Sequence, residues 1–91
     1  MNTLINLTQL ISDTHIIQIK TQLSNSSSTL LLSQDGVYNI PSLDELSVPF
    51  LILQDDAQLR GISIDDLESQ QVIDYSQFVE LTLTHQAVQK C

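Results

Sequence analysis

The sequence predicts a small α/β protein with a mainly parallel sheet and helices on both faces. Short apolar runs alternate with segments of helical spacing, which is typical of βα units. Two of the runs, residues 29–33 and 48–53, are almost continuously apolar, as in strands that are covered on both sides. The length of 91 residues suits one domain and is too short for two, so residues 1–91 are expected to form a single domain.

The first third of the chain predicts a strand, a helix and a loop. Residues 3–7 are short, apolar and tolerant of β structure, so they form the first expected strand. Between residues 8 and 23 the leucines and isoleucines come close to helical spacing. The alternation at residues 17–19 would also suit a strand, and we favour the helix. The segment SNSSS, residues 24–28, is small and polar and predicts the loop that leaves this helix.

The middle of the chain predicts two buried strands with a short helix between them. Residues 29–33 form the first of these strands, and the polar turn QDG, residues 34–36, follows it. A short helix is expected over residues 41–46, because its proline is preset for an early helical position. In the second strand, residues 48–53, Pro49 must lie near the beginning because it has no amide hydrogen to donate.

The last third predicts a short helix, a strand and a closing helix. Residues 55–59 are expected to form one or two helical turns, with aspartates at the amino end and Gly61 after the last turn. Residues 71–75 predict a short strand. The closing helix begins at Ser76, and its apolar side is expected to consist of Phe78, Val79, Leu81, Thr82 and Leu83.

The charge of the chain disfavours contact with nucleic acids and membranes. Eleven acidic residues against three basic ones give a formal net charge of −8, which repels phosphate backbones and anionic membrane surfaces. Hydrophobic residues make up 42% of the chain, which is too apolar for intrinsic disorder. Neither a secretory leader nor an apolar run of roughly 18 residues is found, so we expect a cytoplasmic protein.

The sequence predicts neither a metal site nor a cofactor. Gly36 and Gly61 are the two glycines, so the glycine-rich loops that cradle phosphates are missing, and no serine lies in a GxSxG motif. His15 and His85 show no metal-ligand spacing. We expect His15 at the surface and His85 near the end of the closing helix, where a partial positive charge suits the helix dipole.

Arg60 and two pairs of acidic residues have structural interpretations. The pairs Asp55/Asp56 and Asp65/Asp66 could suggest acid–base catalysis, but adjacent side chains point in different directions. Helix capping and solubility are therefore the favoured roles. Arg60 is expected to form a salt bridge with one of these four aspartates rather than to bind an anion.

Three further residues are candidates for a site. Cys91 is the one residue with obvious nucleophilic potential, and as the last residue it should be mobile and accessible. We favour an incidental thiol over a sulfur acceptor. Tyr75 and Phe78 lie at the junction of a strand and a helix. We favour a place in the core for both, and a role at a subunit interface stays open.

The QDG turn is the candidate with the strongest argument from its place in the fold. Ligands and partners of parallel sheets meet the crevice beyond the carboxyl ends of the strands, and this turn follows a predicted strand. Gly36 is expected to let the chain turn, and Asp35 to satisfy local amides or begin the next element. No nucleophile accompanies them, which disfavours catalysis. We predict that Gln34 and Asp35 face a neighbouring subunit.

Three blocks of the sequence can be compared with known families: LLLSQDGV at residues 30–37, LQDDAQLRGI at 53–62 and VIDYSQFVELTLTH at 72–85. Together they resemble the TusB/DsrH family, the small subunits of bacterial sulfur-relay complexes. Their order and spacing match that family, and the similarity covers nearly the whole chain. The resemblance implies a small three-layer DsrE-like fold and a non-catalytic subunit of a TusBCD-type hetero-oligomer, with TusC-like and TusD-like partners.

The resemblance also implies a place in sulfur transfer. In such complexes a persulfide passes through a cysteine of the TusD-like subunit to a TusE-like acceptor and a tRNA-thiolating enzyme, which makes 2-thiouridine at the wobble position. TusB-like chains generally lack that cysteine, and this chain has none that is expected at the end of a strand or the start of a helix. Some DsrH-type relatives that act in sulfur oxidation carry a cysteine in the first third of the chain, and its absence here favours the tRNA branch.

The chain departs from the family pattern in two places. The SNSSS segment looks longer than usual, and Cys91 stands where relatives often end in an aromatic residue. Two alternatives to the accessory subunit therefore stay open. One is a sulfurtransferase that carries a persulfide on Cys91, and the other is a stand-alone homo-oligomeric module that binds a small ligand in the strand-end crevice.

Overall fold

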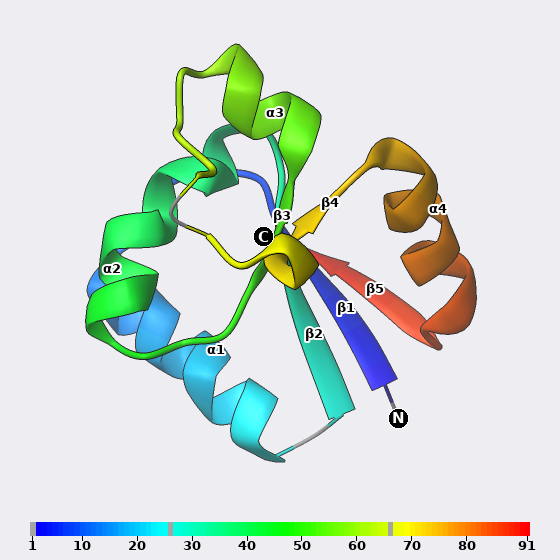
Figure 1. The fold of residues 1–91 in the computed structure, drawn as a ribbon. Coiled ribbons are helices and arrows are strands. Elements are labelled where there is room, and N and C mark those ends of the chain that lie inside the picture. The colour runs from blue at the N-terminus through cyan, green and yellow to red at the C-terminus, as the bar shows by residue number, and fades with distance from the viewer. Residues whose placement is uncertain (1, 26, 66) are drawn as a thin grey trace.

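The computed structural model of the protein describes residues 2–25, 27–65 and 67–91. Within these ranges the chain forms one five-stranded sheet in the order β4-β3-β2-β1-β5, and every neighbouring pair is parallel (Figure 1). The strands are β1 (Asn2–Leu7), β2 (Ser27–Leu32), β3 (Leu51–Leu53), β4 (Val72–Ile73) and β5 (Ala87–Lys90).

Helices connect these strands and cover both faces of the sheet. The α-helices are α1 (Asp13–Asn25), α2 (Ile40–Glu45), α3 (Gln54–Leu59) and α4 (Tyr75–Thr84), and two 3₁₀ segments are η1 (Gln34–Asn39) and η2 (Ser69–Gln71). In Figure 1, α1 and α2 lie on one side of the sheet and α4 lies on the other. The predicted α/β class, with a parallel sheet and helices on both faces, is confirmed.

Alternate residues of the central strands supply two separate apolar clusters. Ile5 and Leu30 belong to the larger cluster, which packs against α1 and α2, whereas Leu4 and Leu31 belong to the smaller cluster beneath α4. All four are at most 2% exposed. Because both faces are buried, no polar residue interrupts the apolar end of β2, which explains its run of leucines.

The direction of winding reverses next to β1. The chain starts at β1 and proceeds through β2 and β3 to β4 at one edge, and α4 then carries it back across the other face to β5 on the far side of β1. Ligands of open α/β sheets bind at such reversals, beyond the carboxyl ends of the strands. The carboxyl edge near β1, β2 and β5 is therefore the place to look for a site.

The predicted loop at residues 24–28 is wrong. The helix α1 continues to Asn25 and β2 begins at Ser27, and Ser26 lies outside the described residues. The Ser24 hydroxyl donates to the Lys20 carbonyl at 3.1 Å, so this serine is accommodated in the last helical turn by a bond to the preceding turn. On the strand side, Ser27 pairs in register with Asn2 of β1, which makes a polar segment into a strand.

Other predicted elements are present with shifted bounds. The first helix begins at Asp13 rather than at residue 8, β3 keeps only the last three of its six predicted residues, and β4 is two residues long. The end of α3 is confirmed, since Gly61 follows it with φ of +70° and donates its amide to the Gln58 carbonyl at 3.1 Å. The described part of the chain contains no helix with both the length and the apolar character needed to cross a membrane.

The strand β5 was not predicted from the sequence. Its four residues include only Ala87 and Val88 as apolar side chains, which is a weak local signal for a strand. It forms because residues 87–90 pair with Thr3–Asn6 of β1, and the Gln86 amide donates to the Asn2 carbonyl at 3.1 Å. The strand β5 therefore lies at one edge of the described sheet, and it leads directly to Cys91.

Candidate functional site

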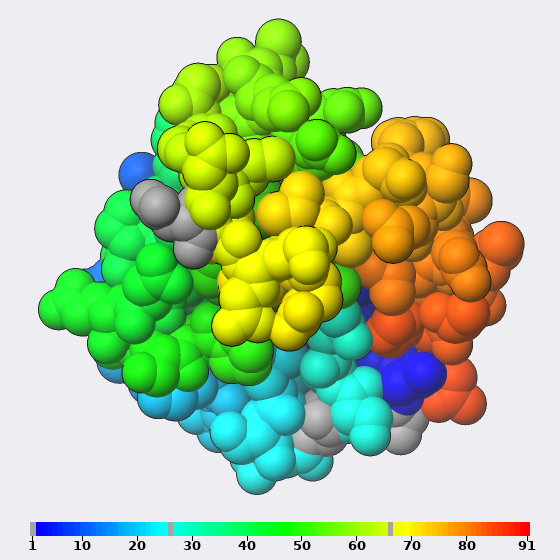
Figure 2. Space-filling model, viewed as in Figure 1, coloured from blue at the N-terminus to red at the C-terminus, as the bar shows by residue number. Residues whose placement is uncertain are grey.

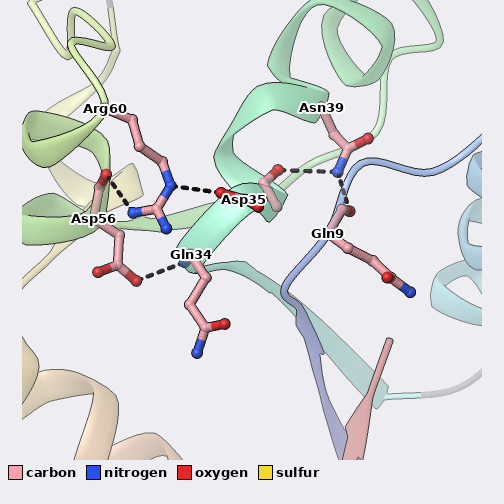
Figure 3. A network of polar contacts seen from close by, with 7 residues as sticks. Gln9, Gln34, Asp35, Asn39, Asp56 and Arg60 are labelled. Atoms are coloured by element: carbon pink, nitrogen blue, oxygen red, sulfur yellow. Dashed lines mark hydrogen bonds and ion pairs between the residues drawn. The ribbon is translucent and has the colours of Figure 1, made fainter.

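The QDG segment begins η1, directly beyond the carboxyl end of β2. Two polar contacts tie it to α3 and the residue after it, and a third holds Arg60 against α3 (Figure 3). The Gln34 amide donates to Asp56 Oδ2 at 2.6 Å. Arg60 Nε donates to Asp35 Oδ1 at 2.9 Å, and Arg60 Nη1 donates to the Asp56 carbonyl at 3.3 Å. These contacts join the segments that follow β2 and β3.

Arg60 does not pair with the aspartates that were predicted for it. Its salt bridge is to Asp35 on η1, while the carboxylate of Asp56 accepts from the Gln34 amide. Asp55 and Asp56 lie in the first turn of α3, which agrees with the predicted favourable place at a helix amino end. Asp65 is exposed, and Asp66 lies outside the described residues.

Gly36 is required for close packing rather than for a turn. It has no left-handed backbone conformation, unlike Gly61. A Cβ at Gly36 would lie 1.8 Å from the Leu7 carbonyl oxygen and 2.6 Å from the Leu7 carbonyl carbon. The backbone of η1 therefore touches the end of β1, and glycine is needed because no side chain fits between them.

Gln34 is the residue of this segment with an unusual backbone. Its φ of 50° lies in the left-handed region, which costs a non-glycine residue roughly 1–2 kcal/mol. The bond from its amide to Asp56 helps to hold that conformation. Its side chain is exposed and points away from the network of Asp35, Asp56 and Arg60 in Figure 3. Gln34 thus presents its amide side chain to solvent at the carboxyl edge.

Asn39 is a buried polar residue that the sequence did not single out. Its side chain is 1% exposed in total, Oδ1 accepts from the Ile11 amide at 3.1 Å, and Nδ2 donates to the Gln9 carbonyl at 2.9 Å and the Gly36 carbonyl at 3.0 Å. It fixes the loop after β1 against η1 (Figure 3). In the sequence, the feature that could have indicated Asn39 is its place directly before the predicted short helix, in the segment NIPSL.

Cys91 lies at the carboxyl edge and is held in place, contrary to the expected mobile tail. It directly follows β5, its amide donates to the Asn6 carbonyl at 2.9 Å, and its carbonyl accepts from the Thr8 amide at 2.9 Å and the Thr8 hydroxyl at 2.8 Å. The residue is half-buried, and Gln89 Nε2 lies 3.6 Å from Sγ. The expectation that no cysteine stands at a strand end is therefore wrong.

The two aromatic candidates have different environments. Tyr75 and Phe78 form an edge-to-face pair with ring centroids 5.8 Å apart and an interplanar angle of 67°. Phe78 is half-buried against the smaller cluster, as the core interpretation predicts. Tyr75 is exposed, so the core interpretation is wrong for it. The pair lies at the start of α4, over the smaller cluster.

The two histidines have separate structural places. His85 follows α4, where Nδ1 lies 2.8 Å from the Leu81 carbonyl and Nε2 lies 2.9 Å from the Thr29 hydroxyl. Because a carbonyl oxygen can only accept, Nδ1 carries the hydrogen in this contact. His15 is half-buried in the first turns of α1. No group of three or more His, Cys, Asp or Glu side chains in the described ranges could hold a metal ion.

Two hollows on the surface of the described residues are lined by residues outside the QDG segment. One, of about 280 Å³, lies at the amino ends of β2 and β3 and includes Leu23 and Phe50. The other, of about 250 Å³, lies beside α4 and includes Ile73, Gln77 and Leu81. Both are smaller than the roughly 300–1,000 Å³ that is usual for ligand pockets. Neither hollow favours a module for a drug-sized ligand.

The fold and these contacts define a class of protein: a small, doubly wound, fully parallel α/β protein whose carboxyl edge is closed by its own polar contacts. Comparison with known families gives the particular one. The chain belongs to the DsrH-like family, because the family model described as DsrH like protein matches residues 11–88. Proteins of this family generally work in sulfur-relay complexes, so membership indicates a role in sulfur relay.

The comparison with solved structures supports the fold. The chain is similar to the crystal structure of the YchN protein from E. coli, with a TM-score of 0.63 and 18% sequence identity over 100% of both chains. At this identity the likeness concerns the fold alone. Among proteins with curated descriptions, none matches the sequence.

Proposed function

We propose that the protein is a non-catalytic, TusB-like subunit of a sulfur-relay complex that supports 2-thiolation of the tRNA wobble uridine in the cytoplasm. Residues 1–91 act as one domain, and the direct partners are TusC-like and TusD-like chains. A TusE-like acceptor takes the sulfur from that complex. The net charge of −8 disfavours a direct grip on tRNA.

One observation carries the proposal. At the end of β2, where α/β proteins commonly place reactive groups, Asp35 is paired with Arg60 and Asp56 is paired with the Gln34 amide. No thiol, hydroxyl or imidazole takes part in this network. An accessory role needs no nucleophile in this network, because the sulfur-carrying cysteine belongs to another subunit. Gln34, Asp35 and Gly36 are proposed to lie near a subunit boundary.

Coexpression tests this function directly. The chain is produced with the TusC-like and TusD-like chains of the same genome, and the mixture is separated by size exclusion with light scattering. We expect one stable species that contains all three chains. Elution of the chain as a separate species under these conditions would overturn the proposal.

A second function is favoured by the position of Cys91. Its thiol lies at the carboxyl edge beside β1, where the winding reverses, and backbone bonds to Asn6 and Thr8 hold the residue there. In this alternative the Cys91 thiolate attacks the outer sulfur of a donor persulfide. A new S–S bond forms on Cys91, the donor S–S bond breaks, and the donor cysteine leaves as a thiolate.

Mass spectrometry separates the two functions. After incubation with a persulfide donor, a sulfur carrier gains the mass of one sulfur atom on the intact chain, and Cys91→Ser loses that gain. An accessory subunit shows no such gain, although it still enters the complex. The wild-type chain without donor is the matched control.

A further inference from the structure

A surface hollow of about 250 Å³ lies between α4 and the β4 end of the sheet. One of its walls is a flank of α4, because the lining residues recur there every three or four positions: Gln77, Glu80, Leu81 and Thr84. The segment η2 supplies Gln70 to the lining. Figure 2 shows these two segments next to each other on the viewed face, η2 in yellow and α4 in orange. We call this space the β4 hollow.

The more buried residues of the β4 hollow are apolar. Leu51 of β3 and Ile73 of β4 line it together with Leu81 of α4. Ile73 belongs to the smaller apolar cluster, and Leu51 and Leu81 pack against that cluster. These three side chains are buried or half-buried and form the apolar floor of the hollow. An occupant must therefore bring an apolar part to this floor.

The rim of the hollow is polar. Its residues are all exposed: Gln70, Gln77, Glu80 and Thr84. The two glutamines have partners of their own, since Gln70 Nε2 donates to Glu68 Oε2 at 2.7 Å and Gln77 Oε1 accepts from the backbone amide of Asp74 at 2.9 Å. Gln70 thus brings a second carboxylate, that of Glu68, to the rim beside Glu80.

No lysine or arginine lines the hollow. Lys20 Nζ donates to a backbone carbonyl at 2.7 Å, and Arg60 pairs with an aspartate on η1. Lys90 lies on β5, at the opposite edge of the sheet from β4. Within the ranges that the structure describes, the one ion pair is that of Arg60, so the Glu80 carboxylate has no cation of its own. The hollow therefore presents an unneutralised negative charge above an apolar floor.

This combination fits a long basic side chain. Lysine and arginine lay their aliphatic stems along apolar surface and keep the charged head at a polar rim. A volume of about 250 Å³ is below the roughly 300–1,000 Å³ of pockets for small-molecule ligands, which favours a single side chain as the occupant. A guanidinium group has donors in a planar fork that matches a carboxylate, so arginine suits Glu80 best.

The charge of the chain points to a different protein as the source of that side chain. A second copy would bring another net charge of −8 to the interface, which opposes self-association. A partner with an excess of basic residues would instead be attracted to the chain, and charge pairs at the interface would fix its orientation.

We propose that the β4 hollow is the docking site for an arginine side chain of a different protein chain in the complex. The stem of the arginine lies on Leu51, Ile73 and Leu81, and its guanidinium group pairs with the Glu80 carboxylate. The proposal rests on the accessory-subunit function, and it names one contact through which this subunit joins its partners. Arginine is among the side chains that contribute most to binding at protein interfaces.

The chain contains a matched pair of glutamates for the test. Glu80 on α4 and Glu45 on α2 are both exposed, and glutamine at either position removes one negative charge without changing the shape of the side chain. Because α2 covers the other face of the sheet, Glu45→Gln controls for the change in net charge (Figure 1). The affinity of the purified chain for the TusC-like and TusD-like chains is measured by titration calorimetry. We expect Glu80→Gln to weaken binding about tenfold and Glu45→Gln to stay within about twofold of wild type.

A double-mutant cycle then identifies the occupant. Each arginine of the bound partner is replaced by glutamine and combined with Glu80→Gln. We expect one arginine whose replacement weakens binding to wild type but has little further effect on binding to Glu80→Gln. If the effects of every partner arginine add to that of Glu80→Gln, no arginine pairs with Glu80 and the proposal is wrong.

The remaining outcomes separate the docking site from the proposed function. Binding that Glu80→Gln does not weaken, or that Glu45→Gln weakens equally, overturns the docking site and leaves the proposed function standing. Failure of wild type to bind either chain overturns the proposed function and, with it, the docking site. Light scattering of the chain alone adds one arm: a homodimer that Glu80→Gln dissociates would show that the hollow binds a second copy, and would overturn the assignment to a different protein.

Discussion

Replacing Gly36 with alanine places a Cβ where the backbone of β1 leaves no room for it. The added Cβ would lie 1.8 Å from the Leu7 carbonyl oxygen, whereas ordinary contact begins at 3.4 Å. The shortfall is about 1.6 Å, the difference between these two distances. The obstacle is backbone of a buried strand, which cannot turn aside as a flexible side chain would, so η1 itself must move.

The expected loss of stability follows from the contacts that this movement breaks. The Ser33 amide donates to the same Leu7 carbonyl at 3.0 Å, and Asn39 Nδ2 donates to the Gly36 carbonyl at 3.0 Å. Each bond contributes about 1 kcal/mol net, and overpacking costs about 1–3 kcal/mol. We therefore expect Gly36→Ala to lower the free energy of unfolding by about 3–5 kcal/mol.

Urea unfolding followed by far-ultraviolet circular dichroism measures this loss. Gly61→Ala is the control, because a Cβ there meets nothing within 4 Å and only the φ of +70° is unfavourable. That strain costs roughly 1–2 kcal/mol. If Gly36→Ala destabilises the protein no more than Gly61→Ala does, then the close approach of η1 to β1 is not the reason for glycine at position 36.

Two other substitutions test contacts that position the site. Asn39→Ala leaves three backbone groups without their buried partner and should lower the free energy of unfolding by about 2–4 kcal/mol. The control is Asn25→Ala at an exposed position, which should change the free energy of unfolding by less than about 0.5 kcal/mol in the same urea assay. Equal losses would contradict the role of Asn39. Asp74→Ala removes the N-cap of α4, in which Asp74 Oδ1 accepts from the backbone amide of Gln77 at 2.8 Å. We expect the free energy of unfolding to fall by about 1 kcal/mol. An unchanged urea midpoint would show that this cap does not stabilise the protein.

The parts of the fold that were predictable are those with a strong local signal. The leucine run that became β2 is apolar because both faces are covered, and the short α2 starts where its proline permits a first turn. The loop prediction for residues 24–28 failed at both ends, because α1 continues to Asn25 and Ser27 pairs with Asn2 of β1. The strand β5 was missed for the same reason, since its partner lies more than 80 residues away.

The candidate site was predictable in place but not in detail. The rule that parallel strands present their carboxyl ends to partners located the QDG segment correctly beyond β2. The partner of Arg60 was not predictable, because Asp35 is 25 residues away and closer aspartates compete for it. The need for glycine at position 36 was also not predictable from the sequence, because it comes from the close approach of the Leu7 carbonyl in another strand.

The closing helix shows how a wrong prediction becomes informative. The sequence predicted one apolar side for α4, but the structure divides those residues between two flanks: Phe78 and Leu81 contact the sheet, while Val79 and Leu83 are exposed. The helix therefore carries more apolar surface than its own sheet can cover. A chain of this length buries only about 60–65% of the surface that its unfolded form exposes, so covering this excess by a partner would add stability that the isolated core cannot supply. If a partner covers this apolar surface, the wild-type chain should unfold at a higher urea concentration in the complex than alone. Leu83→Gln should lose that increase, while its stability as an isolated chain should equal that of wild type.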